Sequence, residues 1–117
     1  MVIQRTQAGR GRAGGDPLAA LANPTRREIV RLVWGQERSA GEIASAFQVS
    51  WPAISQNLRV LRECGLVRER RLGTGRLYRA DRKALRPLAA YLRQMWAQDI
   101  DRLQLLAEAE ERTKSKT

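Results

Sequence analysis

The stretch VSWPAISQNLRVLRECGLV, residues 49–67, predicts a helix together with both of its ends. Ser50 is a residue type that caps helix N-termini, and a proline in the first turn, Pro52, is compatible with such a start. Gly65 stands where the left-handed residue after a helix belongs, because glycine adopts that conformation at little cost. The buried side of this helix repeats at i, i+4 and i+7 and consists of Ile54, Leu58 and Leu61.

The segment before this helix predicts a helix-turn-helix. Ser39 and Glu42 have the S-x-x-E spacing of a capping box, which starts a short helix over residues 39–47. Only residues 48–50 separate that helix from the next one. A short helix, a tight turn and a second helix together form the helix-turn-helix motif.

A β-hairpin is expected directly after the helix-turn-helix. The segments LVRERRL and RLYRA alternate in character, and Gly73, Thr74 and Gly75 lie between them. A hairpin in this place is a wing. Two earlier helices are expected after Asp16 and Asn23, since each is a capping residue followed by proline. The expected fold class is therefore mainly α with a small β-hairpin wing, a winged helix-turn-helix with five helices.

The last of these helices is expected to run from about Pro87 to about Glu111, with apolar residues every three or four positions. At 1.5 Å per residue it would be about 37 Å long, more than a compact winged domain needs. It could fold back onto its own core or pack against a second copy of the chain, and the long apolar stripe favours the second arrangement. The expected dimer interface consists of Leu18, Leu21, Leu88, Leu92, Met95, Trp96, Ile100 and Leu103.

The charge of the chain suggests a polyanionic partner. The 117 residues carry a formal net charge of +10, and residues 50–83 contribute more than half of it. No apolar run approaches the length of a membrane span, no signal region is visible and one cysteine suits a reducing compartment, so we expect a cytoplasmic protein. We expect one domain over residues 16–111, with a disordered arm at 1–15 and a flexible tail at 112–117.

The side of the main helix that faces away from its buried stripe suits the reading of DNA. In helix-turn-helix proteins the N-terminal half of the second helix enters the major groove. Glutamine can pair with adenine, arginine with guanine, and apolar surface can contact thymine methyl groups. Wing arginines would contact the DNA backbone or the minor groove. The expected DNA-binding residues are Ser50, Trp51, Pro52, Ser55, Gln56, Asn57, Arg59, Arg71 and Arg76.

Four segments of the chain resemble the ArsR-type winged-helix repressors: LANPTRREIVRLV, SAGEIASAF, VSWPAISQNLRVLRECGLV and RLGTGRLYRA. The resemblance covers roughly residues 16–106. It implies a homodimeric, cytoplasmic transcriptional repressor that binds a palindromic operator in double-stranded DNA. It also implies that metal sensing is common among relatives, through cysteine pairs in the helix at 39–47 or through His and carboxylate ligands in the last helix.

The sequence departs from this family in two ways. Asn57 stands where relatives often have histidine, and Trp51 is unusual at its position, so an operator sequence cannot be transferred from relatives. The chain also has no histidine and a single cysteine, Cys64, so the metal-sensing ligands of the family are absent. We therefore expect no metal and no cofactor, and the inducer, if one exists, is unknown. Cys64 is either a half-buried residue ending the helix or a redox-sensitive thiol.

A catalytic function is not expected. Without histidine, a glycine-rich phosphate loop or paired carboxylates in a cleft, no reaction class can be assembled. Two binding functions remain open. The first is a sequence-specific DNA-binding repressor, and the second is a winged-helix module that binds protein or RNA through the same basic face. The side chains suited to base reading and the expected dimer helix favour DNA.

Overall fold

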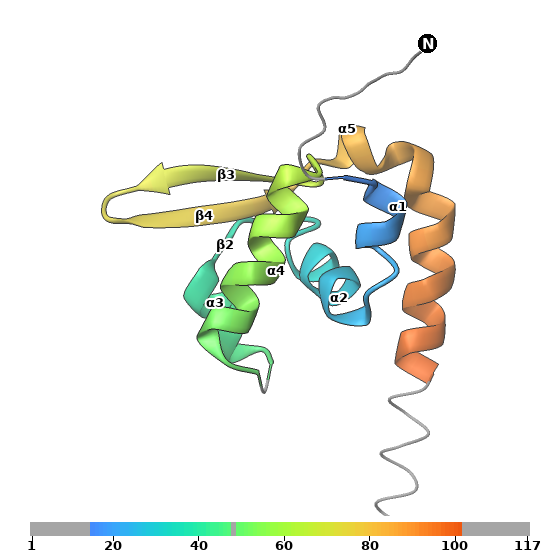
Figure 1. The fold of residues 1–117 in the computed structure, drawn as a ribbon, viewed down its shortest axis with the longest axis horizontal. Coiled ribbons are helices and arrows are strands. Elements are labelled where there is room, and N and C mark those ends of the chain that lie inside the picture. Colours follow the sequence, from blue (N-terminus) through green and yellow to red (C-terminus); the bar gives the residue numbers. More distant parts are fainter. Residues whose placement is uncertain (1–14, 48, 102–117) are drawn as a thin grey trace, which may run out of the picture. The chain divides into compact units, whose positions relative to one another are not determined.

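The computed structural model of the chain describes residues 15–47 and 49–101 (Figure 1). The chain divides into two compact units between Pro87 and Leu88, and each is described by itself. The expected arm at 1–15, apart from Gly15, and the expected tail at 112–117 lie outside the described residues. The single domain expected over residues 16–111 therefore stays a prediction.

The first two helices begin at the predicted capping residues. In α1 (Pro17–Ala20), the Asp16 carboxylate accepts a hydrogen bond from the Leu18 amide at 2.9 Å. In α2 (Pro24–Leu32), the Asn23 side chain accepts one from the Arg26 amide at 3.0 Å. Both caps satisfy amides that have no partner within the helix.

The predicted helix-turn-helix is formed by α3 (Ala40–Ser45) and α4 (Trp51–Glu63). The capping box of α3 is complete, because Ser39 Oγ accepts from the Glu42 amide at 3.1 Å and Glu42 Oε1 accepts from the Ser39 amide at 2.8 Å. Ser50 caps α4 by accepting from the Ala53 amide at 3.3 Å. The predicted apolar stripe of α4 is buried, with exposures of 0 to 2% at Ile54, Leu58 and Leu61.

The C-terminus of α4 ends in a Schellman motif. Gly65 has a φ of 76°, in the left-handed region that the sequence predicted. Its amide donates to the Arg62 carbonyl at 2.9 Å, and the Leu66 amide donates to the Leu61 carbonyl at 2.9 Å. These two bonds satisfy carbonyls at the end of the helix and direct the chain into the next strand.

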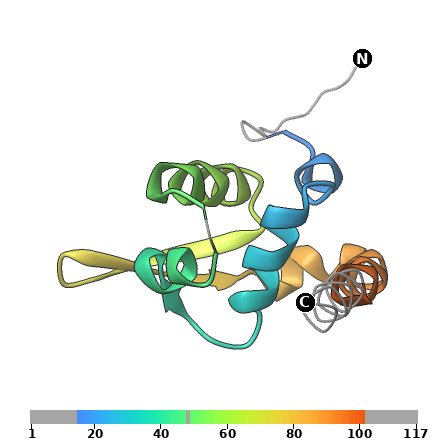
Figure 2. The same ribbon diagram turned by 90° about the horizontal axis from the view of Figure 1, so that it is seen from below.

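The predicted two-stranded wing is part of a three-stranded antiparallel sheet with the strand order β2-β4-β3. Its strands are β2 (Arg38–Ser39), β3 (Val67–Leu72) and β4 (Gly75–Ala80). Gly75 lies in β4, so only Gly73 and Thr74 form the loop. In both views the tip of the β3–β4 hairpin extends beyond the helices (Figure 1 and Figure 2).

The first unit has one hydrophobic core, to which every helix from α1 to α5 contributes buried residues. Leu21, which was expected in a dimer interface, is fully buried within the protomer. Arg27 is also buried, with 3% exposure, and its Nη1 donates to the carbonyls of Leu21 and Ala22 at 3.0 and 3.1 Å. A buried guanidinium is tolerated here because it bonds carbonyls that α1 leaves without helical partners.

The segment after the wing differs from the prediction. Helical structure begins at α5 (Arg82–Leu85), where Asp81 accepts from the Ala84 amide at 3.1 Å, and continues as a 3-10 turn, η2 (Arg86–Leu88). Pro87 therefore lies in a 3-10 turn rather than at the start of the long helix. Residues 89–101 are helical, and the predicted end near Glu111 lies outside the described residues. No helix within 15–47 and 49–101 is both long and apolar enough to cross a membrane.

Replacement of Gly65 by alanine is expected to lower the free energy of unfolding by about 1–2 kcal/mol, because an L-residue is strained at positive φ. An added Cβ would meet no atom within 4 Å, so the loss would come from the backbone alone. Gly35→Ala is the matched control, since Gly35 also has open space but no positive φ. Urea unfolding of both variants measures the difference, and equal stabilities would contradict the proposed role of Gly65.

Candidate nucleic-acid interface

One side of α4 is exposed along its N-terminal half. Trp51 is 53% exposed, and Ser55, Gln56 and Arg59 are exposed as well. These residues lie away from the buried stripe, as the sequence predicted. This side of the helix therefore presents an aromatic ring, a hydroxyl, an amide and a guanidinium to the surroundings, which are the groups that read base edges.

The start of α4 is suited to contact with a phosphate. Its first turn contains no acidic residue, and the N-terminal amides of a helix carry partial positive charge. Ser50 is exposed and its hydroxyl lies beside the Ala53 amide. Pro52, also exposed, fits the first turn without losing a helical hydrogen bond.

Asn57 has a different position from the one expected of a base-reading residue. It is half-buried, its Nδ2 donates to the Ala53 carbonyl at 2.9 Å, and its Oδ1 accepts from Arg26 Nη1 at 3.1 Å. Arg26 Nε in turn donates to the Ala20 carbonyl at 2.8 Å. Both polar ends of the Asn57 amide are thus used inside the protomer, where they connect α4 with α2, and its expected contact with DNA stays a prediction.

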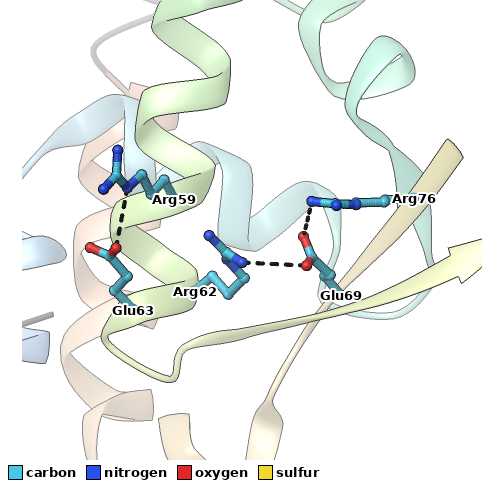
Figure 3. A network of polar contacts seen from close by, with 5 residues as sticks. All are labelled: Arg59, Arg62, Glu63, Glu69 and Arg76. Atoms are coloured by element: carbon cyan, nitrogen blue, oxygen red, sulfur yellow. Dashed lines mark hydrogen bonds and ion pairs between the residues drawn. The ribbon is translucent and has the colours of Figure 1, made fainter. Parts of the chain in front are cut away.

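A network of ion pairs connects α4 with the wing (Figure 3). Arg59 Nε lies 3.2 Å from Glu63 Oε2 within α4. Arg62 Nη1 lies 3.4 Å from Glu69 Oε1 on β3, and the other oxygen of Glu69 lies 3.6 Å from Arg76 Nη1 on β4. Three arginines of this face are thus held by two carboxylates, Glu63 and Glu69.

The wing carries like charges at directly opposed positions. Arg71 is the cross-strand partner of Arg76, two positions beyond the pair of Glu69 and Tyr78 on the same side of the hairpin. Opposed arginines repel each other unless an anion lies near them. Arg71 is exposed, and no acid among residues 15–47 and 49–101 pairs with it. The Arg71 and Arg76 positions expected from the sequence therefore lie together and favour an anionic partner.

Two of the three arginines on the other side of the hairpin, Arg68 and Arg70, are paired with acids of the first unit. Arg70 makes two hydrogen bonds to the Glu37 carboxylate, at 2.7 and 2.8 Å, and these bonds lower the pKa of Glu37. Arg68 Nε lies 3.0 Å from Asp81 Oδ2. These two pairs link the hairpin to the chain before β2 and to the cap of α5, so we assign them to holding the wing in place.

Sequence reasoning missed Glu63, Glu69, Arg62 and Tyr78 as parts of this face. Burial and the neighbouring charge and hydrogen bond of Glu69 raise the pKa of Tyr78, which keeps its hydroxyl protonated beside that carboxylate. The four-residue spacing from Arg59 to Glu63 was a local signal that could have been used. The Glu69 contacts depend on the strand register and on the position of α4, which no local pattern encodes.

The residues expected in a dimer interface differ in exposure. Leu18 in the first unit is 47% exposed and Ile100 in the second is 45% exposed. Leu88, Met95 and Trp96 are half-buried and Leu92 is buried. Leu103 lies outside the described residues. The interface therefore stays a prediction, for which the exposed Leu18 and Ile100 are the most direct probes.

Comparisons with known proteins agree with this geometry. The family model described as "Bacterial regulatory protein, arsR family" matches residues 23–69. HTH-type transcriptional regulator Rv2034 of Mycobacterium tuberculosis is 40% identical over 81 residues, 69% of this chain and 76% of that protein. Transcriptional repressor SdpR of Bacillus subtilis is 39% identical over 54 residues, 46% of this chain and 60% of that protein. A solved structure, "Possible transcriptional regulator for arsenical resistance", is 43% identical with a TM-score of 0.61, over 76% of this chain and 93% of that chain.

The matched region begins at the cap of α2 and ends within β3, so it includes the whole helix-turn-helix. The chain belongs to the ArsR family of bacterial regulatory proteins, which are DNA-binding transcriptional regulators with a winged helix-turn-helix.

Proposed function

We propose that the protein is a cytoplasmic transcriptional repressor that binds a palindromic operator in double-stranded DNA as a homodimer. The observation that carries this proposal is the exposed set of Ser55, Gln56 and Arg59 on α4, together with a wing on which Arg71 lies opposite Arg76. Several relatives are named as repressors, including SdpR. Two copies would place two α4 helices in successive major grooves about 34 Å apart, which calls for a palindromic site.

In this proposal the side chains of α4 and of the wing have different roles. Gln56 and Arg59 read base edges, and Trp51 offers apolar surface to thymine methyl groups. Ser50 and the N-terminus of α4 contact a phosphate, while Arg71 and Arg76 follow the backbone. Phosphate contacts set affinity and orientation, and base contacts set the sequence preference.

The second candidate, a winged-helix module that binds protein or RNA, uses the same basic face. A-form RNA has a deep, narrow major groove that side chains cannot read, so the base-reading set on α4 would serve no purpose there. Family membership also favours DNA over both alternatives. No catalytic role is proposed, since the face consists of groups that bind and carries no nucleophile with an adjacent base.

Control by a transition metal is not part of the proposal. A tight site needs several Cys, His or carboxylate ligands, and the chain has no histidine and one cysteine. Cys64 caps the C-terminus of α4 and is half-buried. We propose that release from DNA depends on a small molecule, a partner protein, oxidation of Cys64 or the amount of the repressor itself. Control by the amount of protein is the first hypothesis.

Gln56→Ala and Arg59→Ala are each expected to weaken binding to the preferred duplex by about 1–3 kcal/mol, and binding to random DNA by less. Arg71→Ala should weaken binding to both duplexes alike and reduce the salt dependence, because a phosphate contact carries no sequence information. Fluorescence anisotropy with a duplex selected from a random pool measures these effects. Arg31→Ala, on neither α4 nor the wing, is the control. Equal losses on both duplexes for Gln56→Ala would mean that another face of α4 reads the bases.

Ile100→Glu combined with Leu18→Glu is expected to convert a dimer into monomers, because a carboxylate buried in an apolar interface without a partner is strongly unfavourable. Both side chains are exposed in the protomer, so its own fold should be retained. Gln98→Glu is the matched control, since it adds the same charge about 200° around the same helix. Light scattering gives the mass. An unchanged dimer in the double variant would remove Leu18 and Ile100 from the interface.

Zinc, cadmium, nickel, copper(I) and arsenite, each at micromolar free concentration under reducing conditions, are expected to leave the complex with the selected duplex intact. The reason is the shortage of ligands, since carboxylates alone hold such ions weakly. The measurement is a DNA-binding titration at constant salt. Dissociation of the complex by any one of these ions would show that the protein has a metal site and would contradict this prediction.

A further inference from the structure

The arginines on the DNA-facing side of α4 and the wing are bound to acids of the same protomer. Arg59 is held by Glu63, and both Arg62 and Arg76 are held by Glu69 (Figure 3). The side chains of the three arginines remain 42 to 64% exposed, so they stay accessible to a phosphate. Each of them must leave or share its carboxylate before it can contact DNA fully.

The position of Glu63 does not serve the stability of α4. It lies in the last turn, where the helix dipole disfavours an acid. Its order relative to Arg59, with the basic residue toward the N-terminus, is also the weaker arrangement for a pair four residues apart. What Glu63 does accomplish is to hold the guanidinium of an arginine that faces the DNA.

Glu69 connects two separate parts of the same face. Its side chain is 21% exposed and its two oxygens point to arginines on different elements, Arg62 on α4 and Arg76 on β4. Tyr78 is its cross-strand partner on β4. Glu69 is therefore less exposed than either arginine and offers both of them an anion within the protomer.

We propose that Glu63 and Glu69 determine specificity by weakening the binding of random DNA more than the binding of the operator. On random DNA the arginines gain only phosphate contacts, and these compete directly with the two carboxylates. On the operator the base contacts of α4 supply additional binding energy, which offsets the separation of Arg59 from Glu63. This inference rests on the proposed function.

The test uses Glu63→Gln, Glu69→Gln and the double variant of the full chain, with Kd measured on two duplexes over a range of salt concentrations. One duplex is selected from a random pool by the wild-type protein, and the other is its scrambled sequence with equal length and composition. Glutamine keeps the shape of the side chain and removes the charge. Glu28→Gln is the matched control, because Glu28 pairs with the exposed Arg31 on α2, outside α4 and the wing.

The double variant is expected to bind the scrambled duplex about three- to tenfold more tightly than wild type, with a steeper salt dependence. Its affinity for the selected duplex should rise less, so the ratio of the two affinities falls. Glu28→Gln should change both affinities slightly and equally, since it alters only the net charge. A larger relative gain on the scrambled duplex than in this control supports the proposal.

Two results would overturn the proposal. If the affinities for both duplexes rise equally, and by as much as in Glu28→Gln, then Glu63 and Glu69 act only through the net charge of the protein. Weaker binding to both duplexes with a lower free energy of unfolding would show that the carboxylates stabilise the wing. If the wild-type protein binds the selected and scrambled duplexes equally, the proposed function itself is contradicted. This failure differs from a failure of the present inference, because it is seen with the wild-type protein alone, before any variant is compared.

Discussion

The hydrogen bonds of Arg26 fix the orientation of α4, the helix proposed to read DNA. The apolar stripe of α4 holds the helix against the core, but hydrophobic contact is not directional and tolerates small rotations and shifts. Arg26 removes that freedom, because its guanidinium bonds both the carbonyl of Ala20, the last residue of α1, and the side-chain oxygen of Asn57 on α4. A rotation of α4 would break the Asn57 bond and leave a half-buried polar group without its partner, which is costly. The direction in which Gln56 and Arg59 point therefore depends on a side chain of α2.

The two adjacent arginines of α2 show how a chain of net charge +10 uses part of its charge internally. Arg27 is buried and bonds the carbonyls of Leu21 and Ala22, while Arg26 bonds that of Ala20. The short α1 leaves these carbonyls without helical partners, and the guanidinium groups replace them. The basic residues of this chain thus serve two purposes. Some form hydrogen bonds to carbonyls at the end of α1, and others attract a polyanion. Counting charges in the sequence cannot separate them, whereas burial does.

Local signals made most of the fold predictable. The caps at Asp16, Asn23, Ser39 and Ser50 act within three residues, so the sequence pattern contains all that determines them. The two-residue strand β2 was missed because it shows no alternation and exists only through its pairing with β4. The start at α5 was missed because Pro87 was a stronger signal than the cap at Asp81. Within the candidate site, Ser55, Gln56 and Arg59 were predictable from helical periodicity, but the roles of Asn57 and Glu69 depend on partners distant in the sequence.

The arrangement of charge on this face suggests why a strongly basic protein can still discriminate among DNA sequences. Attraction to phosphates acts on every sequence, so a face made only of free arginines would bind tightly without preference. Here Arg71, at the wing, has no acid beside it within the described residues and can attract DNA at once, whereas Arg59, Arg62 and Arg76 are held. Exposed ion pairs of this kind are weak, about 0–1 kcal/mol each. They therefore lower the affinity of these arginines for phosphates without preventing the contact. That range lies below the discrimination of about 1–3 kcal/mol that one good base contact provides, so one such contact can offset the loss of a pair. Weak internal pairs are therefore of the right size to be separated by a matching site and retained on a mismatched one.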